Sequence, residues 1–321
     1  MLRYRIPYRI GMILKKMQYF CLPFENKQLC SSKNRYSEYY PIFVLGLPRA
    51  GSTLVYQLLV NSSECCYFSN LATTMHLSPV TVSRVTKIIG GQNPPPTFQS
   101  RYGNTSLWNE PSVGVSIWGR WFPLNQTFMK KNNLNTKMFD ELRSTIYGMQ
   151  NIFSAPFIGK WQGFNSVSGV MNEAFPKCFF VRVKRDYKSV AQSILKARED
   201  TGNVQTWFSS RTSAYNEIIA STHDPVRQAC LQILNLEKDL DDFFSNISKN
   251  KKITVDYADV CHNPSGAITK VFERYNNLNN KLIKTNFEEI PKTFVLSDRK
   301  NVSTLEEIKI EKTISELSEH F

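Results

Sequence analysis

A short apolar run followed by a glycine-bounded loop constrains this chain more than any other feature of its sequence. Residues 41–45 read Pro-Ile-Phe-Val-Leu, which is typical of a buried strand in a parallel sheet. The loop Gly46-Leu47-Pro48-Arg49-Ala50-Gly51-Ser52-Thr53 follows, and apolar residues then recur at helical spacing from Leu54 onward. In this order, backbone N–H groups and the positive end of a helix dipole surround an anion. The sequence therefore predicts a phosphate-binding loop.

This loop differs from the loop of nucleoside triphosphatases at one position. Their pattern, Gly-x-x-x-x-Gly-Lys-[Ser/Thr], needs a lysine after the second glycine, where this chain has Ser52, and its loop cation is Arg49 instead. A kinase or NTPase that handles a Mg-nucleotide normally keeps that lysine, so this alternative is disfavoured but stays open. An ordinary glycine-containing turn between a strand and a helix is the other alternative.

Further strand-to-helix units indicate the fold class. We expect strands at residues 178–183 and 253–256, and helices at residues 135–153, 187–195, 225–244 and 264–275, with a last helix near the C-terminus. Alternating strands and helices predict an α/β fold, a three-layer sandwich around a mostly parallel sheet. Residues 39–321 are expected to form this domain, and residues 1–38 a basic N-terminal arm.

The charge of the chain is unevenly distributed. The formal net charge is +13, from 40 Lys and Arg against 27 Asp and Glu, and residues 1–40 contain eight basic but only two acidic side chains. An anionic partner is expected, and the arm is predicted to lie on a membrane surface as a basic amphipathic segment, to pack on the domain, or to be disordered. A nucleic-acid partner is not expected, because the sequence has no helix-turn-helix, zinc-finger or RNP signature.

The remaining composition bounds the compartment and the cofactors. Seven cysteines are scattered without a CxxC pair or a Cys/His cluster of zinc-ligand spacing, which favours free thiols and predicts no metal site. No run of 18 apolar residues occurs, so no membrane span is expected. The predicted location is cytoplasmic, with peripheral membrane contact left open.

A second motif lies far from the loop in the sequence. Arg185 stands directly after the predicted strand at 178–183, and Ser193 lies eight residues later in the following helix. A residue at a strand tip and another two helical turns on can converge on one dianion, to which they supply a guanidinium and a hydroxyl donor. Asp186, at the start of that helix, is expected to cap it.

The two motifs, in this order, resemble the donor-binding motifs of the sulfotransferase family. That family uses 3′-phosphoadenosine 5′-phosphosulfate (PAPS) as sulfuryl donor, and the Pro-Arg-x-Gly form of the loop is closest to its tyrosylprotein, carbohydrate and bacterial branches. The resemblance covers roughly residues 40–275. It implies a P-loop-like sulfotransferase fold, in-line transfer to a hydroxyl or amine, adenosine 3′,5′-bisphosphate as product and no required metal. A glycan or glycolipid is the expected acceptor.

The resemblance also implies which residues bind the donor and which act in the reaction. The implied donor-binding residues are Gly46, Pro48, Arg49, Ala50, Gly51, Ser52, Thr53, Leu54, Arg185 and Ser193, with Arg299 and Lys300 near the C-terminus. Arg49 and Lys160 are expected to stabilise negative charge on the leaving oxygen.

The general base is the least certain part of the site. Two positions where relatives carry it are occupied here by Asn70 and by Trp161-Gln162-Gly163. Glu110 and His76 are therefore the predicted candidates. Because Asn70 and Ala258 stand where relatives carry acids, a non-catalytic relative that binds nucleotide or membrane remains an alternative. The aromatic residues Trp108, Trp118, Trp121, Trp161 and Phe164 are expected either to line an acceptor pocket or to belong to the core.

Overall fold

A parallel sheet of four strands forms the centre of the molecule. The computed structural model describes residues 6–32, 37–91, 96–100, 103–123, 135–279, 281–296 and 304–319. The strands are β1 (Ile42–Gly46), β2 (Ile158–Lys160), β3 (Phe179–Lys184) and β4 (Lys252–Asp256). Their order in the sheet is β2-β1-β3-β4, and every pairing is parallel. The carboxyl ends of all four strands therefore meet at one edge, where open α/β sheets bind their ligands.

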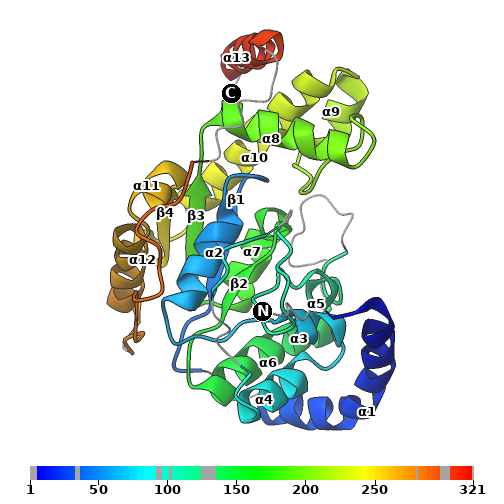
Figure 1. The fold of residues 1–321 in the computed structure, drawn as a ribbon, viewed down its shortest axis with the longest axis vertical. Coiled ribbons are helices and arrows are strands. Elements are labelled where there is room, and N and C mark those ends of the chain that lie inside the picture. Colours follow the sequence, from blue (N-terminus) through cyan, green and yellow to red (C-terminus); the bar gives the residue numbers. More distant parts are fainter. Residues whose placement is uncertain are drawn as a thin grey trace.

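Helices connect and cover the strands (Figure 1). Between β1 and β2 lie α2 (Ser52–Asn61), α3 (Asn70–Thr74), α4 (Pro79–Ile88), α5 (Val115–Trp118) and α6 (Thr136–Phe153). Helix α7 (Phe164–Ala174) joins β2 to β3, and β3 is joined to β4 by α8 (Tyr187–Asp200), α9 (Tyr215–Ser221), α10 (Pro225–Asn246) and the 3₁₀ helix η2 (Lys249–Lys251). The chain then forms α11 (Tyr257–His262), α12 (Pro264–Leu278) and α13 (Thr304–Ser318).

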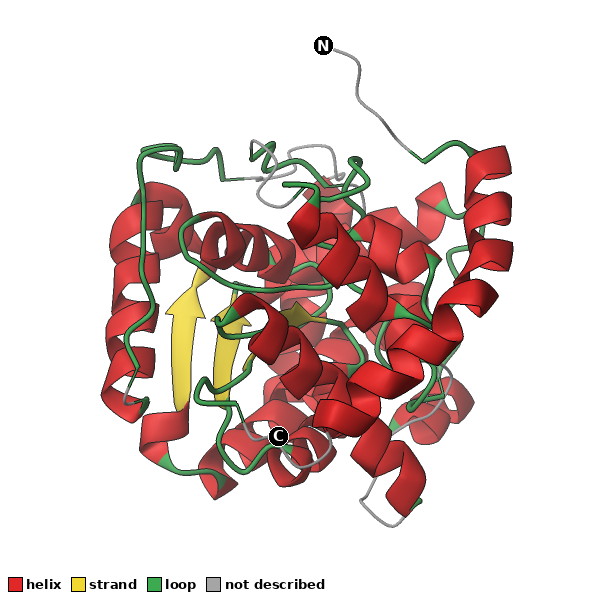
Figure 2. Ribbon diagram, turned by 90° about the horizontal axis from the view of Figure 1, so that it is seen from below, coloured by secondary structure: helices red, strands yellow, loops and turns green. Residues whose placement is uncertain are grey.

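Alternation along the strands builds the two faces of the sheet. Phe43 and Leu45 of β1 belong to one buried apolar cluster together with residues of α6, α7 and α10. Ile42 and Val44 belong to a second cluster with residues of α2, α11 and α12. Because successive side chains of a strand point to opposite faces, each face acquires its own helical layer. The predicted three-layer α/β sandwich is confirmed, and Figure 2 shows the strands enclosed by helices on both sides.

One buried ion pair attaches the long helix α10 to the sheet. Arg182 of β3 is 2% exposed and contacts the carboxylates of Glu237 and Asp241, the latter at 2.6 Å. A guanidinium removed from water needs such partners, since an unpaired buried charge costs several kcal/mol. These contacts hold α10 against β3 three residues before Arg185, which follows directly after the strand.

The N-terminal arm contains a single long helix, α1 (Tyr8–Ser32), which packs on α4 and α6. Its buried Glu25 accepts hydrogen bonds from the backbone N–H groups of Val80 (3.1 Å) and Thr81 (2.7 Å) at the start of α4. These are N–H groups that α4 cannot satisfy internally, so the carboxylate caps α4 from another element. Figure 1 shows α1 curving along the outer edge of the molecule. None of the described helices combines the length and apolar character that crossing a bilayer would need.

Candidate active site

The loop between β1 and α2 depends on its two glycines. Gly46 has φ 149° and Gly51 has φ 91°, both in the region that side chains disfavour. A Cβ on Gly46 would lie 2.7 Å from the carbonyl oxygen of Val183, and one on Gly51 would lie 2.1 Å from the ring of Tyr257. The loop thus packs against the ends of two neighbouring elements as well as turning sharply. It leads into the first turn of α2, whose N–H groups have no acceptor within the helix.

Two amide side chains fix the junction of strand and loop. Asn165 accepts from the N–H of Gly46 (3.3 Å) and donates to its carbonyl (2.8 Å), and Gln162 donates to the same carbonyl (2.7 Å). Asn165 is 1% exposed, so these bonds form in a site with little water. A buried amide with two partners holds a fixed orientation, and the loop therefore starts from a defined position.

The second sequence motif meets the loop directly. Arg185, one residue beyond β3, donates to the carbonyl of Arg49 at 3.2 Å, and its guanidinium lies 4.7 Å from the ring centroid of Tyr257. On α8, the hydroxyl of Ser193 accepts from Nε of Arg49 at 2.9 Å. Asp186 accepts from the N–H of Ser189, which confirms its predicted capping role. Residues 130 or more positions apart in the sequence thus converge on one place.

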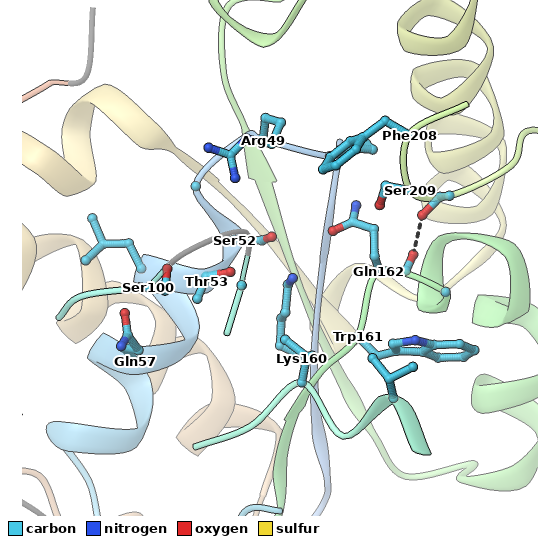
Figure 3. A pocket seen from close by; sticks show the side chains of 18 of the residues that line it. Arg49, Ser52, Thr53, Gln57, Ser100, Lys160, Trp161, Gln162, Phe208 and Ser209 are labelled. Carbon is cyan, nitrogen blue, oxygen red and sulfur yellow. Dashed lines mark hydrogen bonds between the residues drawn. The ribbon is translucent and has the colours of Figure 1, made fainter. Parts of the chain in front are cut away.

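Lys160 enters the same place from β2. It is the last residue of that strand, pairs with Val44 of β1 and is 7% exposed. Its side chain points toward the loop that carries Ser52 (Figure 3). Burial, helped by the positive charge of Arg49, lowers the pKa of Lys160 from its usual value to about 8. No hydrogen bond or ion pair joins Lys160 to another residue in the described part of the chain, so its charge is available to a ligand.

These residues surround a cleft of about 680 Å³ at the carboxyl edge of the sheet (Figure 3). Six of the predicted donor-binding residues in the loop line it, namely Pro48, Arg49, Gly51, Ser52, Thr53 and Leu54. Its charged lining residues within the described chain are all cationic: Arg49, Lys160, Arg185 and Arg211. Four cations without a carboxylate among the described lining residues indicate an anionic ligand. No group of three His, Cys, Asp or Glu side chains in the described chain is arranged to hold a metal ion.

Comparison with known sequences and structures identifies the family. A sequence profile described as the sulfotransferase family matches residues 41–276. The chain belongs to the sulfotransferase family. The fold resembles that of sulfotransferase STF9 from Mycobacterium avium (TM-score 0.54, 13% identity, covering 95% of this chain and 81% of that one). Sulfotransferase STF1 from Mycobacterium tuberculosis H37Rv is similar in fold (TM-score 0.50, 12% identity, 95% and 77% covered). A search of proteins with curated functions found no match.

Family membership makes this protein a transferase of sulfuryl groups, and the remaining predicted site residues can be placed in that light. Gly46 and Ala50 do not line the cleft. Gly46 is the last residue of β1, and the side chain of Ala50 is buried against residues of α8 and α10. Ser193 lies behind Arg49 and is 4% exposed. Arg299 and Lys300 lie outside the residues that the structure describes.

One wall of the cleft combines aromatic rings with polar side chains. Phe122, Trp161 and Phe208 line it, and the ring of Trp161 stacks between those of Trp118 (6.2 Å) and Phe122 (5.8 Å). Of the aromatic residues that were expected to line a pocket or to form core, only Trp161 lines the described cleft. The side chains of Trp118, Trp121 and Phe164 lie in the core, and Trp108 packs against Gly91. The aromatic spacing thus mainly reflects core packing.

The geometry argues against Glu110 as the general base. The side chain is 2% exposed and does not line the cleft. One carboxylate oxygen accepts from Thr97 Oγ1 at 2.7 Å, and the other accepts from the N–H groups of Ser106 (2.6 Å) and Leu107 (2.7 Å). Both oxygens therefore bond to the protein and tie Thr97 to Ser106 and Leu107. These bonds explain why this acid is buried without giving it a role in the reaction.

Replacing Glu110 distinguishes these two roles. In Glu110→Gln, the amide oxygen can still accept from Ser106 and Leu107 while its NH₂ donates to Thr97, so we expect turnover within about threefold of wild type. Glu110→Ala leaves those N–H groups unsatisfied and should lower the free energy of unfolding by about 2–4 kcal/mol. Steady-state kinetics and urea unfolding measure the two effects. A loss of turnover of about 100-fold in a normally folded Glu110→Gln protein would restore the base role.

His76, the second candidate base, also lies away from the cleft. It follows α3, and its carbonyl accepts from Nη1 of Arg120 at 3.0 Å. Burial, together with the nearby charges of Arg120 and Lys15, lowers the pKa of His76. Because it does not line the cleft, the structure gives it no access to an acceptor there.

Sequence reasoning missed two groups of residues at the site. Gln162 lies just after β2, and Asn165 lies in the first turn of α7. Polar side chains just beyond a strand at the carboxyl edge of a parallel sheet could have indicated a place in the site. The segment Phe208–Arg211 lines the far wall, anchored by the hydrogen bond from Ser210 Oγ to the carbonyl of Gln162 at 2.6 Å. That segment has no periodicity, and only the tertiary fold brings it to the cleft.

Proposed function

We propose that this protein transfers the sulfuryl group of PAPS to a hydroxyl or amine acceptor. The observation that carries the proposal is the convergence of two distant motifs: the loop at 46–53 and Arg185 line one cleft rich in cations, and Ser193 lies behind Arg49, from which its hydroxyl accepts. A donor with one phosphate at each end of a ribose needs two separated anion sites. The N–H groups at the start of α2 suit the 5′-phosphosulfate, and Arg185 with Ser193 suits the 3′-phosphate.

The chain's own residues would contribute charge and position to the reaction. PAPS supplies the sulfuryl group: a bond forms between the acceptor oxygen and sulfur, the bond from sulfur to the bridging oxygen breaks, and adenosine 3′,5′-bisphosphate leaves. Arg49 and Lys160, which approach from β1 and β2, are placed to stabilise the charge that gathers on that bridging oxygen. The proton of the acceptor is released to water. Among the described lining residues none is Asp, Glu or His, so positioning and fixed charge are expected to do most of the catalytic work.

A glycan or glycolipid is the acceptor that we propose. The far wall combines the rings of Phe122, Trp161 and Phe208 with the polar groups of Gln162 and Ser209. Sugar rings present an apolar face and a polar rim, and such a wall suits both. We propose that the reaction needs no metal, because four cationic side chains already line the cleft.

A transfer assay tests the proposal. Purified protein is incubated with PAPS labelled in the sulfuryl group and with a mixed panel of glycans, glycolipids and phenols. We expect label in a glycan or glycolipid product and equimolar adenosine 3′,5′-bisphosphate. Binding of adenosine 3′,5′-bisphosphate without transfer to any acceptor would favour a non-catalytic relative. Binding of Mg·ATP in place of adenosine 3′,5′-bisphosphate would favour a kinase or NTPase.

The pH dependence of product binding tests the placement of Lys160. Burial and Arg49 lower its pKa to about 8, whereas an anion beside it would favour the charged form. Above pH 8 the free protein must therefore take up a proton to bind adenosine 3′,5′-bisphosphate fully, and affinity should fall by up to about tenfold per pH unit. Titration calorimetry at pH 7 and 9 measures this. Lys160→Met serves as control and should show no such fall, and equal wild-type affinities at both pH values would refute the placement.

A further inference from the structure

The exposed face of α1 carries an unusual number of large apolar side chains. Tyr8 is 81% exposed and Phe20 80% exposed. Six further apolar or aromatic residues of the helix are also exposed: Ile10, Met12, Ile13, Met17, Tyr19 and Phe24. Scattered exposed apolar residues are ordinary on proteins, but eight on one helix expose an unusually large apolar area to water. A surface of this kind indicates contact with something other than water.

The inner face of the same helix accounts for its packing on the domain. Leu14, Cys21 and Leu29 contact the core cluster beneath, and Gln18 and Glu25 are buried. These positions recur every three to four residues and so form one stripe. The exposed apolar residues lie outside that stripe, and the contacts between α1 and the domain do not cover them. They are therefore not explained by the fold.

Cations are interleaved with the exposed apolar residues. Arg9, Lys15, Lys16 and Lys27 are all exposed on α1, and its one acid, Glu25, is buried against α4. On a helical projection of the turns before Pro23, Arg9 and Lys16 lie on nearly one line, with Ile13 and Phe20 beside it. In the sequence, the segment just before the helix adds Arg3 and Arg5. This face is thus both apolar and positively charged, without an exposed acid in the described part of the helix.

We propose that this face of α1 docks the protein on an anionic lipid bilayer. Aromatic and aliphatic side chains would enter the interface between headgroups and acyl chains, and the long side chains of Lys and Arg would reach the headgroup phosphates and carboxylates. Charge complementarity selects this occupant over a second copy of the chain, since pairing two such faces would bring four cations of each copy together without acids to balance them. Helix α4, which packs on α1, also exposes the apolar residues Val85 and Ile88, and the exposed Ile89 follows directly after it.

Co-sedimentation with vesicles tests the proposal. Full-length protein is mixed with vesicles made of equal parts phosphatidylcholine and phosphatidylserine, and separately with pure phosphatidylcholine. We expect binding to the anionic vesicles that is at least about tenfold stronger and that weakens as salt is added. The double change Lys16→Glu with Phe20→Ser should lower affinity for anionic vesicles by at least about tenfold, because it reverses one charge and removes one anchor.

A matched control comes from the opposite side of the chain's fold. Lys270→Glu with Leu282→Ser alters one exposed lysine and one exposed apolar residue away from α1, and it should bind vesicles like wild type. Thermal unfolding checks that both double variants are folded. Failure of the wild type to bind anionic vesicles, equal binding to neutral ones, or equal losses in the two variants would each overturn the proposal. A dimer in sedimentation velocity that Phe20→Ser abolishes, without vesicle binding, would assign the face to a second copy instead.

Discussion

Replacing Arg185 by alanine is expected to weaken the binding of adenosine 3′,5′-bisphosphate by roughly 30- to 100-fold. A guanidinium that meets a phosphate dianion in a partly buried cleft contributes about 2–3 kcal/mol, which corresponds to that change in affinity. Arg185 also donates to the carbonyl of Arg49 and packs on Tyr257, so its removal takes away a support of the loop as well as a ligand. Titration calorimetry at neutral pH measures the change.

The neighbouring Lys184 provides the control for this experiment. Its ammonium is exposed and lies 3.9 Å from the carboxylate of Asp241, so it points to α10 and does not line the cleft. Lys184→Ala removes the same net charge one residue away and should leave binding within about twofold of wild type. If both variants lose affinity equally, the effect is one of overall charge, and Arg185 does not bind the 3′-phosphate. Unchanged affinity in Arg185→Ala contradicts the assignment outright.

Replacing Arg49 should have the largest effect on the reaction itself. Removing one fixed donor from a developing negative charge costs on the order of 3–4 kcal/mol, so Arg49→Ala should lower the rate of transfer by about 100- to 1000-fold. Donor binding should fall much less, because the backbone N–H groups of the loop remain in place. A single-turnover measurement with labelled PAPS separates transfer from binding and from product release.

A conservative variant isolates the part that charge plays at position 49. Arg49 has φ 69°, and Lys or Ala at this position would adopt the same left-handed backbone, so the two variants differ in side chain alone. Arg49→Lys keeps the cation but loses the hydrogen bond to Ser193, and we expect it to retain transfer within about tenfold of wild type. Equal rates in Arg49→Ala and wild type would show that this cation does not take part in transfer.

Much of the fold could be predicted because β1 is a short continuous apolar run and β3 is apolar apart from Arg182 and Lys184. The runs at 42–46 and 179–184 are buried on both faces, which gives them a composition that few other elements share. The two anion-binding motifs could also be placed, since each lies where a strand passes into a helix. Their convergence follows from topology, because β1 and β3 are neighbours in the sheet.

The parts that could not be predicted depend on tertiary contacts. Glu110 looks like any acid in a polar loop until Thr97, Ser106 and Leu107 are seen to occupy its carboxylate. Lys160 was placed by family resemblance, since β2 has only three residues and little pattern of its own. The sequence left open whether the basic arm packs on the domain or lies on a membrane, because which of its residues face inward depends on contacts with α4 and α6.

One titration shows whether the cleft binds a nucleotide that carries two separated phosphates. Calorimetry compares adenosine 3′,5′-bisphosphate with adenosine 5′-triphosphate in the presence of Mg²⁺, using wild type and Arg185→Ala. We expect tight binding of the bisphosphate, at least about 100-fold weaker binding of Mg·ATP, and loss of bisphosphate affinity in Arg185→Ala. Tighter binding of Mg·ATP, or bisphosphate binding that does not depend on Arg185, would contradict it.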